Sequence, residues 1–262
     1  MIDVFHLNSY TCQKVVRRLS DTRFNFIPVR TEDIPKIPED SILLWGDGTQ
    51  HHFSAKRDPK PELITNADKN WLKVNIDQHS DTLLNVYDDE QIPRCWNHIA
   101  FSALIGLQIG LIMPEKFKCK KKQMIFLNEM SNRDCWLPNV SYFDISKLKS
   151  FEGKIQATID LDILNFYPVY TDIEINETWV LLEEGFNFDE LLTICEILNS
   201  KNATRLDIGG LWIPDEYELE QIKEFEISEK VYPSNRISNV YTKDNIKKAL
   251  NFLKEVLCVL TQ

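Results

Sequence analysis

The stretch that decides the fold lies at residues 71–81 and reads Trp-Leu-Lys-Val-Asn-Ile-Asp-Gln-His-Ser-Asp. Its apolar start leads into three potential metal ligands, Asp77, His79 and Asp81, at positions i, i+2 and i+4. Because successive side chains of a β-strand alternate between faces, these three would share one face. Neighbouring carboxylates that are partly out of water repel each other, and a divalent cation is the simplest way to neutralise them. The alternative, for this stretch taken alone, is a polar strand end that runs into a solvated loop.

The composition is that of an ordinary globular protein. The chain has 262 residues, of which 43% are hydrophobic and 27% charged. Its formal net charge of −10 argues against a nucleic-acid binder, which would need a basic surface. The same charge would suit a cationic ligand or an arginine-bearing peptide, although many cytosolic proteins are acidic without a special reason.

The sequence also bears on location. It contains no run of about 18 apolar residues, so we expect no membrane span. The first residues have neither a basic region nor a long apolar stretch, so we expect no signal peptide. The six cysteines are scattered and form no Cys-x-x-Cys pair, which predicts reduced thiols in a cytoplasmic protein.

Short apolar runs alternate with helical patterns along the chain. Besides the strand that begins at Trp71, we expect strands at 2–7, 24–29, 42–45, 124–127, 155–162 and 204–208. We expect helices at 12–19, 96–112, 188–198, 214–225 and 245–260. This alternation predicts an α/β fold with three layers, α-β-α, around a mostly parallel central sheet. We find no linker or repeat and expect one domain over residues 1–262.

Polar side chains gather at the ends of these expected strands, where open parallel sheets bind their ligands. The set adds His51, Asp160, Asp162 and Asp207 to the triplet at 77–81. Without Asp207, the set offers four carboxylates, Asp77, Asp81, Asp160 and Asp162, and two imidazoles, which would balance two divalent cations. Oxygen-rich ligation with imidazole suits Mn²⁺, with Fe, Co or Zn as weaker candidates. Two such metals close together make a bound water acidic enough to yield a nucleophile near neutral pH.

These segments resemble the motifs of the arginase and agmatinase superfamily, the ureohydrolases. Residues 77–81 resemble the Asp-x-His-x-Asp motif, and residues 158–162 (Thr-Ile-Asp-Leu-Asp) resemble the Ser-x-Asp-x-Asp motif. Residues 46–54 resemble a distorted Gly-Gly-Asp-His-Ser segment, and residues 182–185 resemble a loop that packs near the arginase substrate. Order and approximate spacing match over residues 42–215, which implies an arginase-like fold.

The resemblance also implies a ligand set for two Mn²⁺ ions per chain. Asp77 and Asp160 would bridge the two ions. The other ligands form two pairs: His51 or His52 with Asp81 at one ion, and His79 with Asp162 at the other. We prefer His51 to His52 because it directly follows Gln50, which takes the position of the family's aspartate.

Two residues receive catalytic roles from the same resemblance. Asp81 would orient the attacking hydroxide. His98 matches the proton-shuttle histidine of the family in order and rough spacing, and a histidine titrates in the range that protonation of the leaving amine requires. The alternative for His98 is a histidine that caps or packs locally at the start of a helix.

The sequence departs from the family at the position that binds the guanidinium group of the substrate. The arginase strand that ends in a guanidinium-binding glutamate reads Leu-Asp-Ile-Gly-Gly at 206–210, with glycine in place of glutamate. A carboxylate must still orient the planar cation, and Asp207, Glu183 and Glu184 are the candidates. Asp207 has a structural alternative, as a strand-end residue.

The loop that holds the α-carboxylate and α-amine of a free amino acid has no clear counterpart. That gap is compatible with an arginine carried by a peptide. Within the superfamily, the chain resembles most the peptide arginases, which convert arginine side chains of ribosomally made precursor peptides to ornithine and release urea. The resemblance implies an arginine-containing precursor peptide as partner. Two alternatives are a hydrolase of free arginine, agmatine or another small guanidino compound, and a non-catalytic arginase-like protein that binds a peptide.

Overall fold

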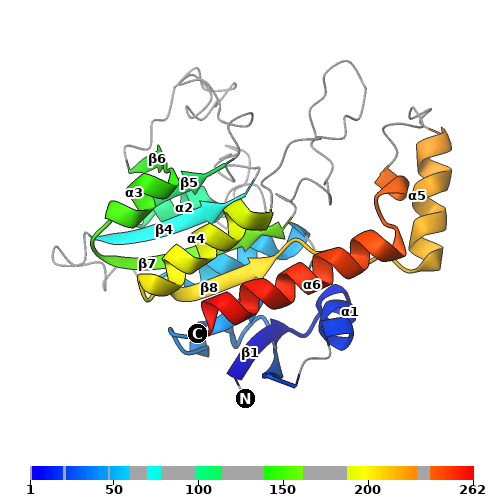
Figure 1. The fold of residues 1–262 in the computed structure, drawn as a ribbon, viewed down its shortest axis with the longest axis horizontal. Coiled ribbons are helices and arrows are strands. Elements are labelled where there is room, and N and C mark those ends of the chain that lie inside the picture. Colours follow the sequence, from blue (N-terminus) through cyan, green and yellow to red (C-terminus); the bar gives the residue numbers. More distant parts are fainter. Residues whose placement is uncertain are drawn as a thin grey trace.

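The computed structural model describes residues 2–19, 22–46, 48–59, 70–77, 98–113, 139–161, 188–228 and 237–262. Within them, eight strands form one sheet in the order β2-β1-β3-β8-β7-β4-β5-β6 (Figure 1). Each pair of neighbouring strands is parallel. The strands are β1 Ile2–Leu7, β2 Phe24–Val29, β3 Ile42–Leu44, β4 Trp71–Ile76, β5 Gln108–Ile112, β6 Val140–Tyr142, β7 Lys154–Asp160 and β8 Thr204–Gly209. Their carboxyl ends therefore meet at one edge of the sheet.

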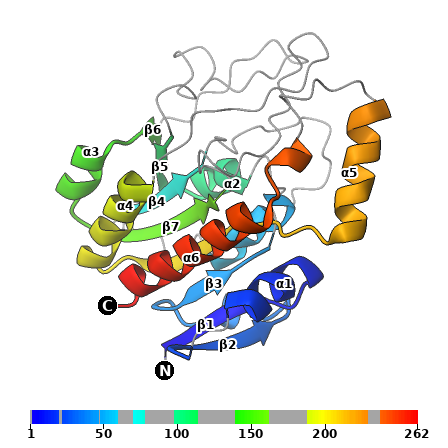
Figure 2. The same cartoon turned by 45° about the vertical axis from the view of Figure 1, so that its right-hand side comes forward.

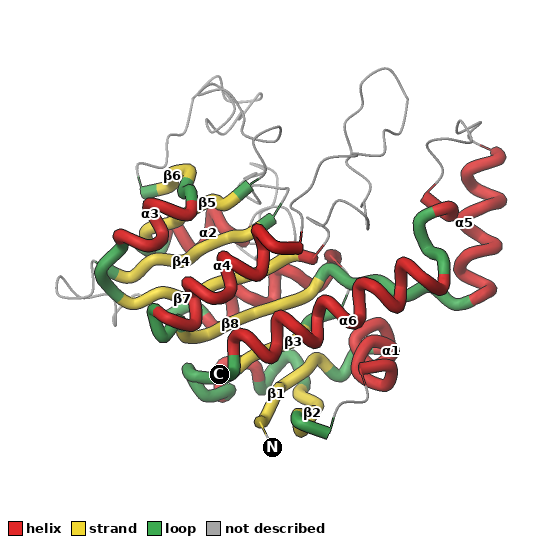
Figure 3. The backbone as a smooth tube through the Cα atoms, viewed as in Figure 1, coloured by secondary structure: helices red, strands yellow, loops and turns green. Residues whose placement is uncertain are grey.

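Helices cover both faces of this sheet. The described helices are α1 Tyr10–Leu19, α2 His98–Leu104, α3 Ile145–Ser150, α4 Phe188–Ser200, α5 Glu216–Ser228 and α6 Lys243–Leu260, with the 3₁₀ segments η1 Ile34–Lys36, η2 Gly48–Arg57 and η8 Ile237–Asn239. Figure 2 shows that α5 stands apart from the sheet and covers neither face. In Figure 1, α4 and α6 lie in front of β7 and β8, and α2 lies behind the sheet; Figure 3 shows the strands in yellow between the two helical layers. The three-layer α-β-α fold predicted from the sequence is confirmed.

The central strands β4 and β7 are covered on both faces, so neither presents a face to solvent. Every residue of β4 and six of the seven residues of β7 are buried, as expected for parallel strands that are covered on both sides. The helix α6 buries an apolar stripe against α4, where the rings of Phe188 and Phe252 stack with centroids 4.5 Å apart. Thr242 caps α6 by accepting a hydrogen bond from the backbone N–H of Asn245. Among the described helices, none has the length and apolar character to cross a membrane.

Most predicted elements appear within one or two residues of their expected bounds, but the helix at 96–112 is wrong in its second half. The helix α2 ends at Leu104, and Gly106 takes φ +100°, a conformation that ends helices and that glycine adopts without strain. The following residues form β5, which pairs with β4 and β6. The short elements β6 and α3 were not predicted, and the strand expected at 124–127 lies outside the described residues.

Candidate metal centre

Two of the predicted carboxylates stand side by side at the carboxyl edge of the sheet. Asp77 directly follows β4, and Asp160 is the last residue of β7. The two strands are neighbours, and their register pairs Ile76 with Ile159. The next residue on each strand is therefore one of these aspartates, and both are at most 2% exposed.

The segment η2 brings His51 between them. His51 Nδ1 lies 3.3 Å from Asp77 Oδ2 and 3.5 Å from Asp160 Oδ2. Among the described residues, one ligand atom from each of the three lies within 4.8 Å of the other two. Two buried carboxylates and one buried imidazole at this spacing form a donor set that suits a divalent cation. We call these three residues, His51, Asp77 and Asp160, the ligand cluster.

The ring of His51 is oriented from two further sides. Its Nε2 lies 2.8 Å from the hydroxyl of Thr158, which precedes Asp160 by two residues on the same face of β7. Trp45 stacks on the ring with a centroid distance of 4.4 Å and an interplanar angle of 15°. Because Thr158 engages Nε2, Nδ1 is the nitrogen that faces the two carboxylates. Metal-binding histidines are commonly held this way, with the second ring nitrogen in a hydrogen bond.

His98 lies next to the ligand cluster. It is the first residue of α2, and its side chain is fully buried. Its ring centroid is 4.1 Å from that of His51, with the planes tilted by 55°. The helix α2 thus delivers an imidazole beside the cluster, where a proton could be exchanged.

Two glycines at the end of β8 make room for this arrangement. A Cβ on Gly209 would lie 2.0 Å from the indole ring of Trp45. Gly210 takes φ +79°, and a Cβ there would lie 1.6 Å from Asp160 Oδ1. Neither Gly209 nor Gly210 therefore has space for a side chain, so the glutamate expected at the end of this strand fits at neither position.

Asp207 pairs with a guanidinium of the protein itself. Arg57, the last residue of η2, donates from Nη1 to Asp207 Oδ1 at 2.7 Å. Its Nη2 donates to the backbone carbonyls of Pro38 and Ser41 at 3.0 and 3.1 Å. Burial raises the pKa of Asp207 to about 6, against the opposing effect of Arg57. This geometry favours the structural alternative for Asp207, which fastens the end of η2 to β8.

The other predicted site residues are not part of the described ligand cluster. His52 is partly buried, and its ring packs against that of Phe53 with centroids 4.1 Å apart. Five lie outside the described residues, and their roles stay predictions: His79, Asp81, Asp162, Glu183 and Glu184. Sequence reasoning missed Trp45 and Arg57, since neither belongs to a motif and both act through contacts distant in sequence.

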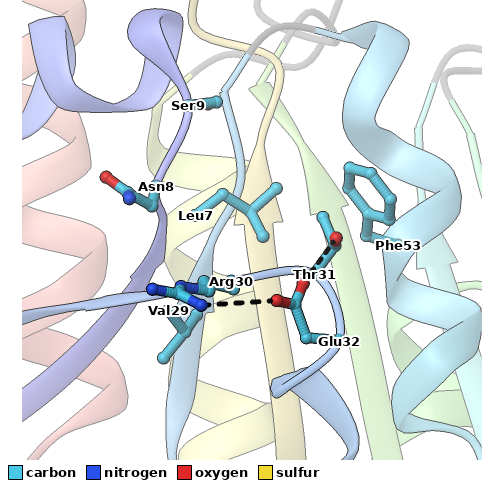
Figure 4. A pocket seen from close by; sticks show the side chains of 8 residues that line it. All are labelled: Leu7, Asn8, Ser9, Val29, Arg30, Thr31, Glu32 and Phe53. Carbon is cyan, nitrogen blue, oxygen red and sulfur yellow. Dashed lines mark hydrogen bonds and ion pairs between the residues drawn. The ribbon is translucent and has the colours of Figure 1, made fainter.

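A cavity of about 210 Å³ opens elsewhere on the same edge of the sheet, at the ends of β1 and β2 (Figure 4). Figure 4 shows Arg30 and Glu32 paired across part of it, with Phe53 of η2 on the opposite side. Ser9, which also lines the cavity, donates to the side chain of Gln50, the residue before His51. The cavity lies over β1 and β2, whereas the two aspartates of the cluster belong to β4 and β7.

The fold is similar to several solved structures, although no protein-family model and no curated protein matches the sequence. An arginase from Bacillus subtilis has 12% identity and a TM-score of 0.52, with 98% of each chain covered. A putative agmatinase from Clostridium difficile also has 12% identity and a TM-score of 0.52, over 99% of this chain and 96% of that one. The agmatine ureohydrolase of Thermoplasma volcanium has 14% identity and a TM-score of 0.51, over 99% and 89%. At these identities the similarity establishes the fold, and it agrees with the arginase-like fold expected from the motifs.

Proposed function

We propose that this protein, which has the fold of arginases and agmatinases, is a metal-dependent hydrolase that cleaves a guanidinium group. The observation that carries the proposal is the ligand cluster, which lies fully buried at the carboxyl ends of parallel strands. This is the edge at which open α/β sheets bind ligands. Fold and cluster together support the proposal, since each alone is compatible with other functions.

The cluster fits a divalent cation by its chemistry. Asp77, Asp160 and His51 Nδ1 offer two oxygens and one nitrogen, and two carboxylates buried this close need a positive partner. When bound, the metal would lower the pKa of a water molecule and so supply a nucleophile near neutral pH. We propose two Mn²⁺ ions, with His79, Asp81 and Asp162 completing the set, because four carboxylates and two imidazoles balance that charge.

The described residues next to the ligand cluster have two further roles in the proposed reaction: they orient His51, and they supply a proton. Thr158 and Trp45 hold His51 in one ring orientation. His98, buried beside that ring, would pass a proton to the amine that leaves when the guanidinium carbon is attacked. The buried setting keeps bulk water away from both histidines.

We further propose that the substrate is an arginine side chain within a peptide, converted to ornithine with release of urea. Asp207 is paired with Arg57, and Gly210 leaves no space for a carboxylate, so β8 supplies no guanidinium partner within the described residues. This directs the proposal to Glu183 and Glu184 for that contact. The net charge of −10 favours approach of a cationic peptide.

Urea release tests the function directly. Purified protein with Mn²⁺ should release urea from an arginine peptide whose N-terminus is acetylated and whose C-terminus is amidated. The Asp77→Asn variant should release none, because it replaces a carboxylate of the ligand cluster by a neutral amide, which is a weak ligand. Urea from free arginine or agmatine alone would replace the peptide substrate by a small guanidino compound. Peptide binding without urea from any of these substrates would refute catalysis and favour the non-catalytic alternative.

A further inference from the structure

A second buried polar cluster lies on the same face of the sheet as the ligand cluster, and we call it the anchor cluster. Lys73 Nζ donates to Asp58 Oδ1 at 2.7 Å and to Ser102 Oγ at 2.9 Å. Ser102 Oγ donates to Asp58 Oδ2 at 2.5 Å, and Gln156 Nε2 donates to Asp58 Oδ1 at 2.7 Å. Both carboxylate oxygens of Asp58 are thus engaged inside the protein. The four members, Asp58, Lys73, Ser102 and Gln156, come from four different parts of the chain.

The anchor cluster joins the same four segments that position the site. On β4, Lys73 precedes Asp77 by four residues, and on β7, Gln156 precedes Asp160 by four, so each pair shares one face of its strand. The register confirms that the two anchor residues are adjacent, since it pairs Lys73 with Gln156.

Each of the other two segments also carries one residue of the anchor cluster and one residue of the site. On α2, Ser102 follows His98 by four residues, which places both on one side of the helix. Asp58 is the residue that follows η2, the segment that carries His51. Asp58 therefore ties the end of η2 to both strands and to α2 through one carboxylate.

Because the anchor cluster is buried, its side chains are held in one arrangement. Lys73 is 1% exposed, and the side chain of Asp58 is 5% exposed, so neither can turn to solvent. A buried ion pair is held only when its remaining hydrogen bonds are satisfied, and apolar residues of similar size usually serve a core as well. The hydrogen bonds and the ion pair of the anchor cluster are directional, so they fix the relative placement of the four segments.

We infer that Asp58 is a positioning residue for the proposed reaction: it sets His51 against the two aspartates and His98 against His51. The inference rests on the proposed function. The contacts of Asp58 with the other three members of the anchor cluster have two separate effects. The contacts of Asp58 with Lys73 and Gln156 hold η2, and so govern metal affinity. The contact with Ser102 holds α2, and so governs the rate at which His98 acts.

Three variants test the inference. In Ser102→Ala, α2 loses its hydrogen bonds to Asp58 and Lys73, together with the bond from Ser102 Oγ to the backbone carbonyl of His98. We expect kcat for urea release to fall about tenfold while the Mn²⁺ affinity of the metal-free protein stays within twofold of wild type. The matched control is Ser200→Ala, since Ser200 Oγ bonds to the backbone within α4 on the other face of the sheet. The control should match the wild type in both measurements.

The double variant Asp58→Asn/Lys73→Met removes both charges together, so that no unpaired ion stays buried. The single variant Asp58→Asn leaves the Lys73 ammonium buried and should lower the melting temperature. We expect the double variant to recover the melting temperature, but to bind Mn²⁺ about 10- to 100-fold more weakly than wild type in a calorimetric titration. A purely structural anchor would recover both quantities together.

The results separate the two proposals. If the double variant regains the wild-type melting temperature and Mn²⁺ affinity, and Ser102→Ala keeps its kcat, Asp58 is structural and the inference is overturned. If wild type binds Mn²⁺ but releases no urea, the proposed function fails, while the calorimetric titration still decides whether Asp58 sets the cluster. If wild type binds no Mn²⁺, both proposals fail.

Discussion

Replacing Thr158 by valine tests the ligand cluster with the smallest change. Valine has nearly the shape of threonine, so the substitution leaves no cavity and removes only the hydroxyl that contacts His51 Nε2 at 2.8 Å. Both side chains are almost fully buried, and no solvent can replace the lost partner. Leaving a buried polar group without its hydrogen bond costs about 1–3 kcal/mol.

Part of this cost should appear in metal binding. The hydroxyl orients the ring so that Nδ1 faces Asp77 and Asp160, and loss of such a supporting contact typically weakens metal binding about 10- to 100-fold. At about 1.4 kcal/mol per factor of ten, this corresponds to roughly 1.4–2.8 kcal/mol, within the range that the hydrogen bond can supply. The metal-free protein should also lose about 1 kcal/mol of its free energy of unfolding.

Calorimetric titration of the metal-free protein with Mn²⁺ measures the first effect, and urea denaturation measures the second. The matched control is Thr204→Val on the neighbouring strand β8, because the buried Thr204 hydroxyl has no hydrogen-bond partner within the described residues. That control should keep the wild-type affinity. A Thr158→Val protein that binds Mn²⁺ within twofold of wild type would refute our account of how His51 is held.

Three further outcomes follow from the described geometry. Gly210→Ala should weaken Mn²⁺ binding at least tenfold, since its Cβ would occupy the position of Asp160 Oδ1, and unchanged binding would contradict that placement. Asp207 should titrate with a pKa of about 6, measurable from its carboxyl ¹³C shift, and a midpoint below pH 4 would count against this. Because the folded-state pKa lies above the ordinary 3.8, the folded protein takes up this proton first, so the carboxylate costs stability above pH 6 and that cost declines between pH 6 and pH 4. Cys195, whose pKa burial raises to about 12, should not react with a disulfide reagent at pH 8 until the protein unfolds; rapid labelling of the folded protein would argue against its burial.

The failed part of the secondary-structure prediction has a local cause. A short apolar run such as 108–112 fits a buried helix and a buried parallel strand equally well, because both are covered on all sides. Only its pairing with β4 and β6 selects the strand. The strand β2 was predictable at its true bounds because polar residues flank it on both sides, Thr22 and Arg23 before it and Arg30 and Thr31 after it.

The sequence by itself determined that strands end in carboxylates and histidines, and that such strands belong to a parallel α/β sheet. Apolar runs and residue spacing are local properties, and they suffice for these conclusions. Tertiary structure alone decided that β4 and β7 are neighbours, which sets Asp77 beside Asp160 although the two are distant in sequence. It also places His51, which the motif resemblance had favoured over His52, against both aspartates, and it pairs Asp207 with Arg57. These outcomes depend on strand order and on side-chain packing between distant segments, and no spacing along the chain encodes either of them.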